Sequence, residues 1–200
     1  MTEYWDLTDD QRRPLGITHP RGRQYPLPDG TFHTVVVVLT VDTEGHLLIT
    51  RRSPNKGMYP GYWEPTGGSG VAGEDSITSA LRELHEETGL EASPDRLTLL
   101  GTVREPGAFA DIYLHRFPGP SADAVITLQE GETDAFRWVT FYNFDLLLQH
   151  GLIPGNVAMV IGTVRDKLIE AVGEAVFYRR DEPLDELLSA CPARNPGVKP

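Results

Sequence analysis

The alternation of hydrophobic and polar positions predicts strands and helices along most of the chain. Residues 34–41, TVVVVLTV, are β-branched and apolar, which is typical of a central strand buried on both faces. Residues 42–45 predict a turn, and residues 46–51 predict the strand that returns from it. Shorter apolar runs predict four further strands, at residues 62–66, 97–104, 110–117 and 135–140.

A helix is predicted after the glycine-rich segment that follows residue 66. Four apolar residues lie there at the spacing of one helix face, Ile77, Ala80, Leu81 and Leu84. Asp75 or Ser76 can cap its N-terminus, and Gly89 suits its C-terminal cap. Strands on both sides of this helix predict an α/β fold, with a mixed sheet sandwiched between helices (α/β/α). Further helices are predicted at residues 141–150, 156–172 and 184–188.

The first 31 residues are predicted to form a separate arm or short hairpin. They contain the apolar residues Tyr4, Trp5, Leu7, Leu15, Ile17, Tyr25 and Leu27. A free solvated tail would not hold this much apolar surface, so we expect the arm to pack on its own domain or on a second subunit. Because two-fold dimers are the commonest soluble oligomers, we expect a homodimer with the arm near its interface. One domain with C-terminal helices would follow at residues 32–190, and a flexible tail at 191–200.

Composition narrows the classes of function. The 200 residues are 40% hydrophobic, enough for one α/β domain with a sizeable core. The formal net charge of −11 argues against general nucleic-acid binding, which needs a basic surface. No apolar run approaches the roughly 18 residues of a membrane span, and the N-terminus lacks the pattern of a signal peptide. The single cysteine, Cys191, forbids an internal disulfide, so we expect a reducing, cytoplasmic location.

Three glutamates on one helix face carry the strongest functional signal. Glu83, Glu86 and Glu87 lie at i, i+3 and i+4, where like charges repel by about 0.2–0.5 kcal/mol per pair. They also occupy the last helical turn, whose dipole favours cations. A bound divalent cation would turn this repulsion into coordination, and oxygen ligands without a nearby cysteine favour Mg²⁺ or Mn²⁺. Arg82 lies beside the glutamates and can orient them by charge-assisted hydrogen bonds.

The segment around these glutamates resembles the signature of the Nudix hydrolases. Gly68 is followed after five residues by Glu74, and after seven more by REL-x-EE-x-GL at residues 82–90. Every fixed position of that signature is matched. The resemblance implies the Nudix fold over most of the chain, from residue 30 to residue 150. It also implies metal-dependent cleavage of a diphosphate linkage in a nucleoside diphosphate derivative or a related small molecule.

The preceding loop is similar to the isopentenyl-diphosphate isomerases, which share the Nudix fold. Residues 51–63, RRSPNKGMYPGYW, contain the pattern R-x-x-x-K-x-x-x-P-x-x-W. In those isomerases the pattern leads to a catalytic Cys and a metal-binding His, whereas this chain continues with glycines. Isomerase activity is therefore not expected. Arg51, Arg52 and Lys56 are either diphosphate-binding cations or solvated loop charges.

Two other nucleotide-binding signatures are weak or missing. Residues 68–73 match G-x-G-x-x-G, but Glu74 and Asp75 occupy the helix N-terminus where a pyrophosphate would have to lie. No G-x-x-x-x-G-K-[ST] occurs, which excludes a P-loop NTPase. The glycines are better explained as a loop that lets a backbone carbonyl reach a metal, with Gly67 or Gly68 as the donor.

Outside the signature, several residue roles stay open. Many Nudix enzymes use one more carboxylate as metal ligand or general base, and the candidates are Glu130 and Glu132, followed by Glu105 and Asp111. Trp63 and Phe109 could stack on a base, although aromatic residues at such spacing are more often part of a core. His33 and His115 lie within strand patterns, and we expect structural roles for them.

Together these features predict a Mg²⁺-dependent Nudix pyrophosphohydrolase, with Mn²⁺ as an alternative ion. Arg82 would orient the cluster, and Glu74 would support the junction between loop and helix. A carboxylate of the cluster, or Glu130 or Glu132, would take the proton of the attacking water. The alternative is a non-catalytic sensor of a nucleotide or prenyl diphosphate built on the same fold. The predicted metal ligands are Glu83, Glu86, Glu87 and Gly68.

Overall fold

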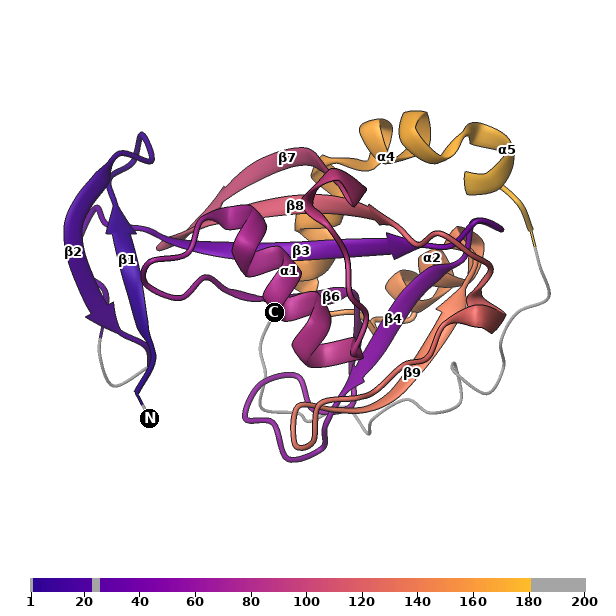
Figure 1. The fold of residues 1–200 in the computed structure, drawn as a ribbon, viewed down its shortest axis with the longest axis horizontal. Helices are drawn as coiled ribbons and strands as arrows, with labels where there is room; N and C mark the ends of the chain where they lie inside the picture. The colour runs from indigo at the N-terminus through magenta and orange to yellow at the C-terminus, as the bar shows by residue number, and fades with distance from the viewer. Residues whose placement is uncertain (1, 23–25, 181–200) are drawn as a thin grey trace.

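The structure is a computed structural model that describes residues 2–22 and 26–180 (Figure 1). Its main element is a seven-stranded mixed sheet built around β3 (His33–Val41). β3 runs parallel to β8 (Ala108–Arg116) along its whole length, and β8 pairs antiparallel with β7 (Leu97–Glu105). The pair of β3 and β8 is parallel, and the other strand pairs described in this sheet are antiparallel.

The other edge of β3 is covered by two different strands. β6 (Thr66–Ser69) pairs antiparallel with the first half of β3, and β4 (Leu47–Arg52) meets its last residue. β4 then pairs with β5 (Trp63–Glu64) and β9 (Thr133–Val139). β3 is the buried central strand that the sequence predicts.

Helices cover both faces of the sheet, so the predicted α/β/α architecture is confirmed (Figure 1). Successive side chains of β3 alternate between the faces. Val36 and Val38 pack in one core with Leu84 of α1 (Ser76–Thr88). Val37 and Leu39 belong to the opposite core. The helices on that side are α2 (Phe141–Gln149), α3 (Gly155–Thr163), α4 (Arg165–Val172) and α5 (Glu174–Phe177).

Helix α1 begins and ends at the residues that the sequence indicates. The side chain of Asp75 accepts a hydrogen bond from the backbone N–H of Thr78 at 2.9 Å, so Asp75 rather than Ser76 is the N-cap. Gly89 adopts a left-handed conformation with φ of 72°, and its N–H donates to the carbonyl of His85. These two caps fix which residues occupy the last turn.

The predicted strand at 62–66 is two strands. Pro65 separates β5 from β6, and β5 pairs with β4 whereas β6 pairs with β3. Proline has no N–H to donate to a ladder, so a continuous strand through this position is unfavourable. The glycines after it are correspondingly part of β6 and not of a free loop.

The predicted single helix at 156–172 was wrong: the structure divides it into α3 and α4 at Val164. The N–H of Val164 bonds the carbonyl of Ile161, three residues back, at 3.1 Å. Gly162 and the two β-branched residues that follow have low helix propensity, which weakens the helix here. The guanidinium of Arg165 then pairs with Asp145 of α2, which fixes the start of α4.

Residues 4–20 of the N-terminal arm form a two-stranded hairpin, β1 (Tyr4–Thr8) and β2 (Pro14–Pro20), which stands at one end of the sheet (Figure 1). It packs on its own domain through Leu7, which is 1% exposed, and through Trp5, whose ring stacks on His33 at 3.9 Å. Leu15 and Ile17 of β2 remain exposed. The homodimer stays a prediction.

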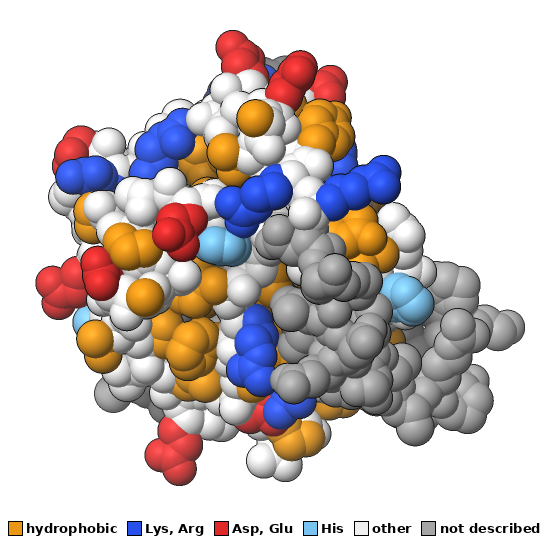
Figure 2. All heavy atoms as spheres, turned by 90° about the vertical axis from the view of Figure 1, so that its right-hand side faces the viewer, with side chains coloured by type: hydrophobic (Ala, Val, Ile, Leu, Met, Phe, Trp, Pro, Cys, Tyr) orange, Lys and Arg blue, Asp and Glu red, His pale blue; other side chains and the backbone are white. Residues whose placement is uncertain are grey.

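None of the described helices is long and apolar enough to cross a membrane. On the face shown in Figure 2, basic side chains are scattered among acidic and apolar ones. The predicted helix at 184–188 and the predicted tail at 191–200 lie outside the described residues.

Arg12 ties the hairpin to the sheet, and its removal is predicted to destabilise the protein. Its guanidinium makes two 2.7 Å bonds to the carboxylate of Asp111, which is 2% exposed and also accepts bonds from Ser76 and Thr102. In Arg12→Ala this buried carboxylate loses its cation, so we expect the free energy of unfolding to fall by about 2–3 kcal/mol in urea titrations.

Arg13→Ala is the matched control, because Arg13 pairs with Asp9 at the exposed tip of the hairpin. We expect a change of about 0.5 kcal/mol or less there, as for other surface ion pairs. Equal effects of the two variants would contradict the anchoring role of Arg12.

Burial of His115 predicts a loss of stability in acid. Desolvation lowers the pKa of His115 to about 4, with a smaller contribution from the charge of Arg96. Between the unfolded pKa of 6.5 and the folded value, the unfolded state binds more protons, so stability falls as pH falls. In His115→Gln this component is absent. From pH 7 to pH 4.5 we expect the free energy of unfolding of the wild type to fall by about 2 kcal/mol more than that of the variant. A gap independent of pH would contradict the assignment.

Candidate active site

A cleft of about 310 Å³ lies between the N-terminal ends of the central strands, α1 and the hairpin. Seven glutamates and four basic residues line it, an excess of three negative charges among the described residues. Helix α1 supplies four of these side chains, Arg82, Glu83, Glu86 and Glu87. The structure therefore brings together the acidic cluster that the sequence predicts and adds carboxylates from elsewhere.

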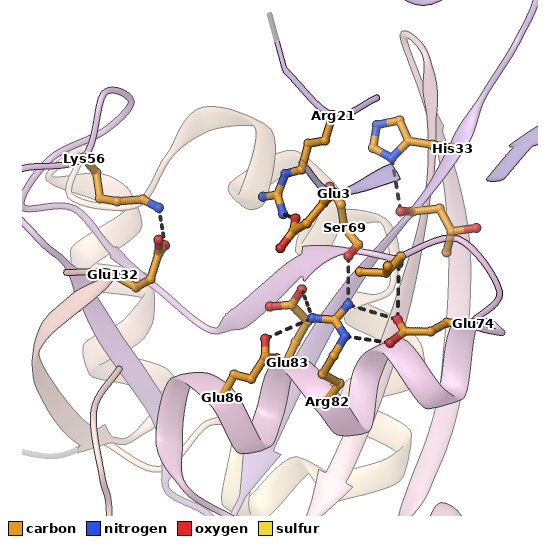
Figure 3. A network of polar contacts seen from close by, with 12 residues as sticks. Glu3, Arg21, His33, Lys56, Ser69, Glu74, Arg82, Glu83, Glu86 and Glu132 are labelled. Carbon is orange, nitrogen blue, oxygen red and sulfur yellow. Dashed lines mark hydrogen bonds and ion pairs between the residues drawn. The ribbon is translucent and has the colours of Figure 1, made fainter. Parts of the chain in front are cut away.

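Arg82 connects the acidic residues of the cleft (Figure 3). Its Nε and Nη2 donate to the two oxygens of Glu74 at 2.8 and 3.0 Å. Its Nη1 donates to Glu83 at 2.9 Å and to Glu86 at 3.0 Å. Nη2 also donates to the backbone carbonyl of Ser69 in β6. One guanidinium thus joins the helix, the loop before it and the adjacent strand.

Glu74 holds the loop between β6 and α1. Besides Arg82, its carboxylate accepts bonds from the N–H of Val71 and the hydroxyl of Ser79. Burial raises the pKa of Glu74, but the bonds from Arg82 and Ser79 outweigh it, so the pKa lies below its usual value. Glu74 is therefore ionised and fully engaged at the junction.

Glu83 lies against the backbone of Gly68, and any larger residue there would displace its carboxylate. A Cβ at Gly68 would lie 2.2 Å from the carboxyl carbon of Glu83. Glu83 is 8% exposed, and desolvation raises its pKa, which the bonds and charge of Arg82 offset only in part. The close approach places a backbone segment of β6 beside this carboxylate.

Glu87 is a buried carboxylate without a complete set of partners. It is 8% exposed, and its Oε2 has no hydrogen-bond partner among the described residues. Desolvation raises its pKa well above 4.5, and the neighbouring charges of Glu64 and Glu83 raise it further. An unpartnered buried carboxylate costs stability, so this position fits a residue that receives a ligand.

The cleft residues fit a divalent cation. Hard cations take carboxylate and carbonyl oxygens, and the helix presents three carboxylates beside an exposed strand backbone. Nη1 of Arg82 bonds both Glu83 and Glu86, and it engages one oxygen of each carboxylate. A cation can therefore take the other oxygens while Arg82 keeps its contacts.

A second group of possible ligands, Asp42, Glu44 and His46, has atoms within 4.8 Å of one another in the turn after β3. Asp42 already accepts bonds from the N–H groups of Glu44, His46 and Ser121. The guanidinium of Arg179 contacts the carbonyl of Glu44 and the ring of His46. These bonds and the charge of Arg179 explain the group as a structural turn, and none of its three residues lines the cleft.

The predicted substrate-binding cations divide into two kinds. Arg52 lines the cleft and pairs with Glu64, and Lys56 lines it and pairs with Glu132. Arg51 does not line the cleft; it pairs with Asp134 at 2.7 Å.

The remaining carboxylate candidates also differ in whether they line the cleft. Glu132 and Glu105 line the cleft, whereas Glu130 is exposed and lies outside the lining. Both carboxylate oxygens of Asp111 already accept hydrogen bonds, from Arg12, Ser76 and Thr102. We therefore exclude Asp111 as a free ligand or base in this arrangement.

The aromatic and histidine candidates are structural. Trp63 is 2% exposed and Phe109 is 7% exposed, and neither lines the cleft. His33 stacks on Trp5, and His115 faces the hydroxyl of Thr40.

Three cleft residues were missed by sequence reasoning. Glu64 sits in β5, where burial raises its pKa despite the charge of Arg52. The sequence could have indicated Glu64, because it lies in the short strand directly before the glycines, and a strand that leads into a site carries side chains there. Glu3 and Arg21 come from the hairpin, and no local pattern could place them beside the α1 glutamates, which follow more than 60 residues later.

The fold and the cleft together define an α/β/α protein with an acidic site whose oxygen ligands suit a divalent cation. The family model described as NUDIX domain matches residues 31–157. The chain belongs to the Nudix family, and it is accordingly a hydrolase of the class that acts on phosphorus-containing anhydrides.

Known proteins support this membership. The chain is 31% identical over 150 residues to an uncharacterized Nudix hydrolase of Listeria monocytogenes, covering 74% of this chain and 86% of that protein. A crystal structure of a protein from Deinococcus radiodurans has a TM-score of 0.62 and 24% identity, covering 82% of this chain and 98% of that one. That likeness shows the fold.

The resemblance to the isomerases is real over part of the chain. Isopentenyl-diphosphate Delta-isomerase of Streptomyces griseus is 41% identical over 101 residues, covering 50% of this chain and 49% of that protein. The segment after Trp63 nevertheless continues EPTGGSG at residues 64–70, with neither a cysteine nor a histidine. Cys191 lies outside the described residues.

The contact between Gly68 and Glu83 predicts a selective effect on cation binding. In Gly68→Ala the new Cβ must displace the Glu83 carboxylate. Because that carboxylate is the flexible end of a side chain, we expect a stability loss of about 1 kcal/mol or less. We expect Mn²⁺ binding, followed by calorimetry, to weaken at least about tenfold.

Gly57→Ala is the matched control, because nothing lies within 4 Å of a Cβ at Gly57. It should bind Mn²⁺ as wild type does. Undiminished Mn²⁺ binding by Gly68→Ala would contradict the proposed placement of Glu83 at the cation.

Proposed function

We propose that this protein is a Mg²⁺-dependent pyrophosphohydrolase that cleaves the diphosphate linkage of a nucleoside diphosphate derivative or a related small molecule. The observation that carries the proposal is Glu87, a buried carboxylate with an unpartnered oxygen in a cleft with an excess of negative charge. Such a site repels an anionic substrate unless cations bind first. Membership of a family whose enzymes generally use divalent metals supports the same reading.

Glu83, Glu86 and Glu87, with the backbone of Gly68, would hold the cation. When bound, Mg²⁺ polarises a phosphoryl oxygen and lowers the pKa of a water, with Mn²⁺ as the alternative ion. Arg82 would keep the carboxylates in position, because it already bonds two of them. Glu74 would act through Arg82, as the partner that fixes its guanidinium.

A carboxylate of the cleft would accept the proton of the attacking water. The candidates are a carboxylate of the cluster and the two glutamates in the loop before β9. Of the two glutamates in the loop before β9, Glu132 is the better candidate because it lines the cleft, whereas Glu130 does not.

Arg52 and Lys56 would bind the diphosphate. Each lines the cleft and is paired with one carboxylate, Glu64 or Glu132. A phosphate group carries more charge than a carboxylate and can take over part of these contacts. Arg51 is withdrawn from this role, because its guanidinium is bonded to Asp134 outside the cleft.

The substrate class is to be found by a hydrolysis screen with identified products. The panel contains ADP-ribose and another sugar nucleotide, a damaged nucleoside triphosphate, a dinucleoside polyphosphate and a prenyl diphosphate. We further propose a cytoplasmic location and a homodimer, the latter testable by light scattering at micromolar concentration. Tight binding of a panel member without turnover would instead support a sensor built on this fold.

Replacing Glu83 tests the assignment of the acidic cluster. Glu83→Gln keeps the size of the side chain but removes the charge that a cation needs. We expect kcat/KM with Mg²⁺ to fall more than about tenfold, which corresponds to at least 1.4 kcal/mol of transition-state stabilisation. The measurement is product release from whichever panel member the wild type cleaves.

The matched control is Glu91→Gln, which makes the same change at an exposed position just beyond helix α1. It should retain wild-type activity. A loss of less than tenfold in Glu83→Gln, with unchanged thermal stability, would refute the role of Glu83.

A further inference from the structure

The N-terminal hairpin reaches into the cleft. Glu3 and Arg21, at the two ends of the hairpin, both line it. The N–H of Arg21 donates to the carbonyl of Glu3 at 2.8 Å, and its Nη1 pairs with the Glu3 carboxylate at 2.5 Å. In Figure 3 the two side chains lie above α1, on the side where Glu83 and the Ser69 carbonyl face the cleft. Neither residue belongs to the matched family domain, which begins at residue 31.

The hairpin is fixed to the segment that precedes α1. The N–H of Ala72 donates to the carbonyl of Tyr4 at 2.8 Å, and the N–H of Gly73 donates to the carboxylate of Asp6 at 2.7 Å. Together with the pair of Arg12 and the buried Asp111, these bonds hold β1 and the turn that leads to β2. Arg21 is therefore carried on an anchored element and not on a free tail.

Arg21 is the least engaged cation of the cleft among the described residues. Its side chain is 45% exposed and its partner Glu3 is 51% exposed, so this ion pair contributes little stability and exchanges easily. The side chains of the other three cations are less exposed, 21% for Arg52, 25% for Lys56 and 23% for Arg82. The positive charge of Arg21 also acts on Glu83, whose pKa it lowers slightly against the larger effect of burial.

We propose that Arg21 is a substrate-contacting residue on the hairpin side of the cleft. It gives up its ion pair with Glu3 and binds a phosphate group of the diphosphate instead. Glu3 then acts as an internal anion that occupies Arg21 until a more highly charged group arrives. The hairpin would thus select substrates with a full diphosphate over monophosphates. This inference rests on the proposed function and assigns to the hairpin a part of the site that lies outside the family domain.

Binding of a diphosphate that cannot be hydrolysed tests this proposal directly. Methylene diphosphonate is titrated in the presence of Mg²⁺ into wild type, Arg21→Ala, Arg21→Lys and Glu3→Gln, with the dissociation constant read by calorimetry. We expect Arg21→Ala to bind about tenfold more weakly, Arg21→Lys to recover part of the loss, and Glu3→Gln to bind more tightly than wild type. Binding of phosphate should change by less than twofold.

Arg13→Ala is the control, because it removes an exposed hairpin arginine that does not line the cleft. It should bind methylene diphosphonate as wild type does. For a substrate that the wild type cleaves, Arg21→Ala should raise KM about tenfold and leave kcat within twofold. A general loss of hairpin structure would instead lower thermal stability, and Glu3→Gln would not gain affinity.

Binding by Arg21→Ala within twofold of wild type would overturn the proposal, as would wild-type protein that does not bind methylene diphosphonate. The proposed function has a separate outcome. Wild type that binds the probe in an Arg21-dependent manner but cleaves no member of the panel would refute the pyrophosphohydrolase and leave the role of Arg21 supported.

Discussion

The guanidinium of Arg82 is the interaction on which the site depends. It bonds Glu74 through two nitrogens, Glu83 and Glu86 through the third, and the backbone of β6 as well. Without it, the helix would present like charges at i, i+3 and i+4 near its C-terminal end, where the helix dipole also opposes them. A single planar cation with five donors therefore makes the acidic face compatible with a folded helix.

The geometry of the sheet determines where this helix face points. β3 carries alternate side chains into two separate cores, and α1 packs on the core that contains Val36, Val38 and Leu84. This packing turns the opposite edge of α1 toward β6, whose glycines allow the backbone to approach Glu83. The hairpin, anchored by Arg12 on the buried Asp111, covers the other side of the cleft. Packing, strand backbone and hairpin thus converge on one acidic cavity.

The sequence predicted the parts of this arrangement that depend on local physics. The caps of α1, its apolar stripe and the three glutamates can each be recognised from residues that lie close together in the sequence. The break of the C-terminal helix at Val164 and the convergence of Glu64, Glu3 and Arg21 were not predicted. The convergence depends on contacts between segments far apart in the chain, and each of these residues alone resembles an ordinary surface charge. The helix break had a local signal in Gly162 and the β-branched residues after it, but the pairing of Arg165 with Asp145 of α2 had none. Pro65, in contrast, was a local signal for the division of β5 from β6 that could have been used.

The central claim is that Glu87 is kept buried and incompletely partnered in order to receive a cation. A buried carboxyl with a raised pKa lowers the stability of the folded state as pH rises from the unfolded value of 4.5 to the folded pKa, and this loss persists at higher pH, so its retention needs another reason. Thermal unfolding of wild type and Glu87→Gln at pH 7.5, with and without Mg²⁺ at constant ionic strength, tests this most directly. The account predicts that Mg²⁺ raises the melting temperature of the wild type, and that Glu87→Gln melts higher without Mg²⁺ but no longer responds to it. A wild type indifferent to Mg²⁺, or a Glu87→Gln variant that responds as the wild type does, would contradict it.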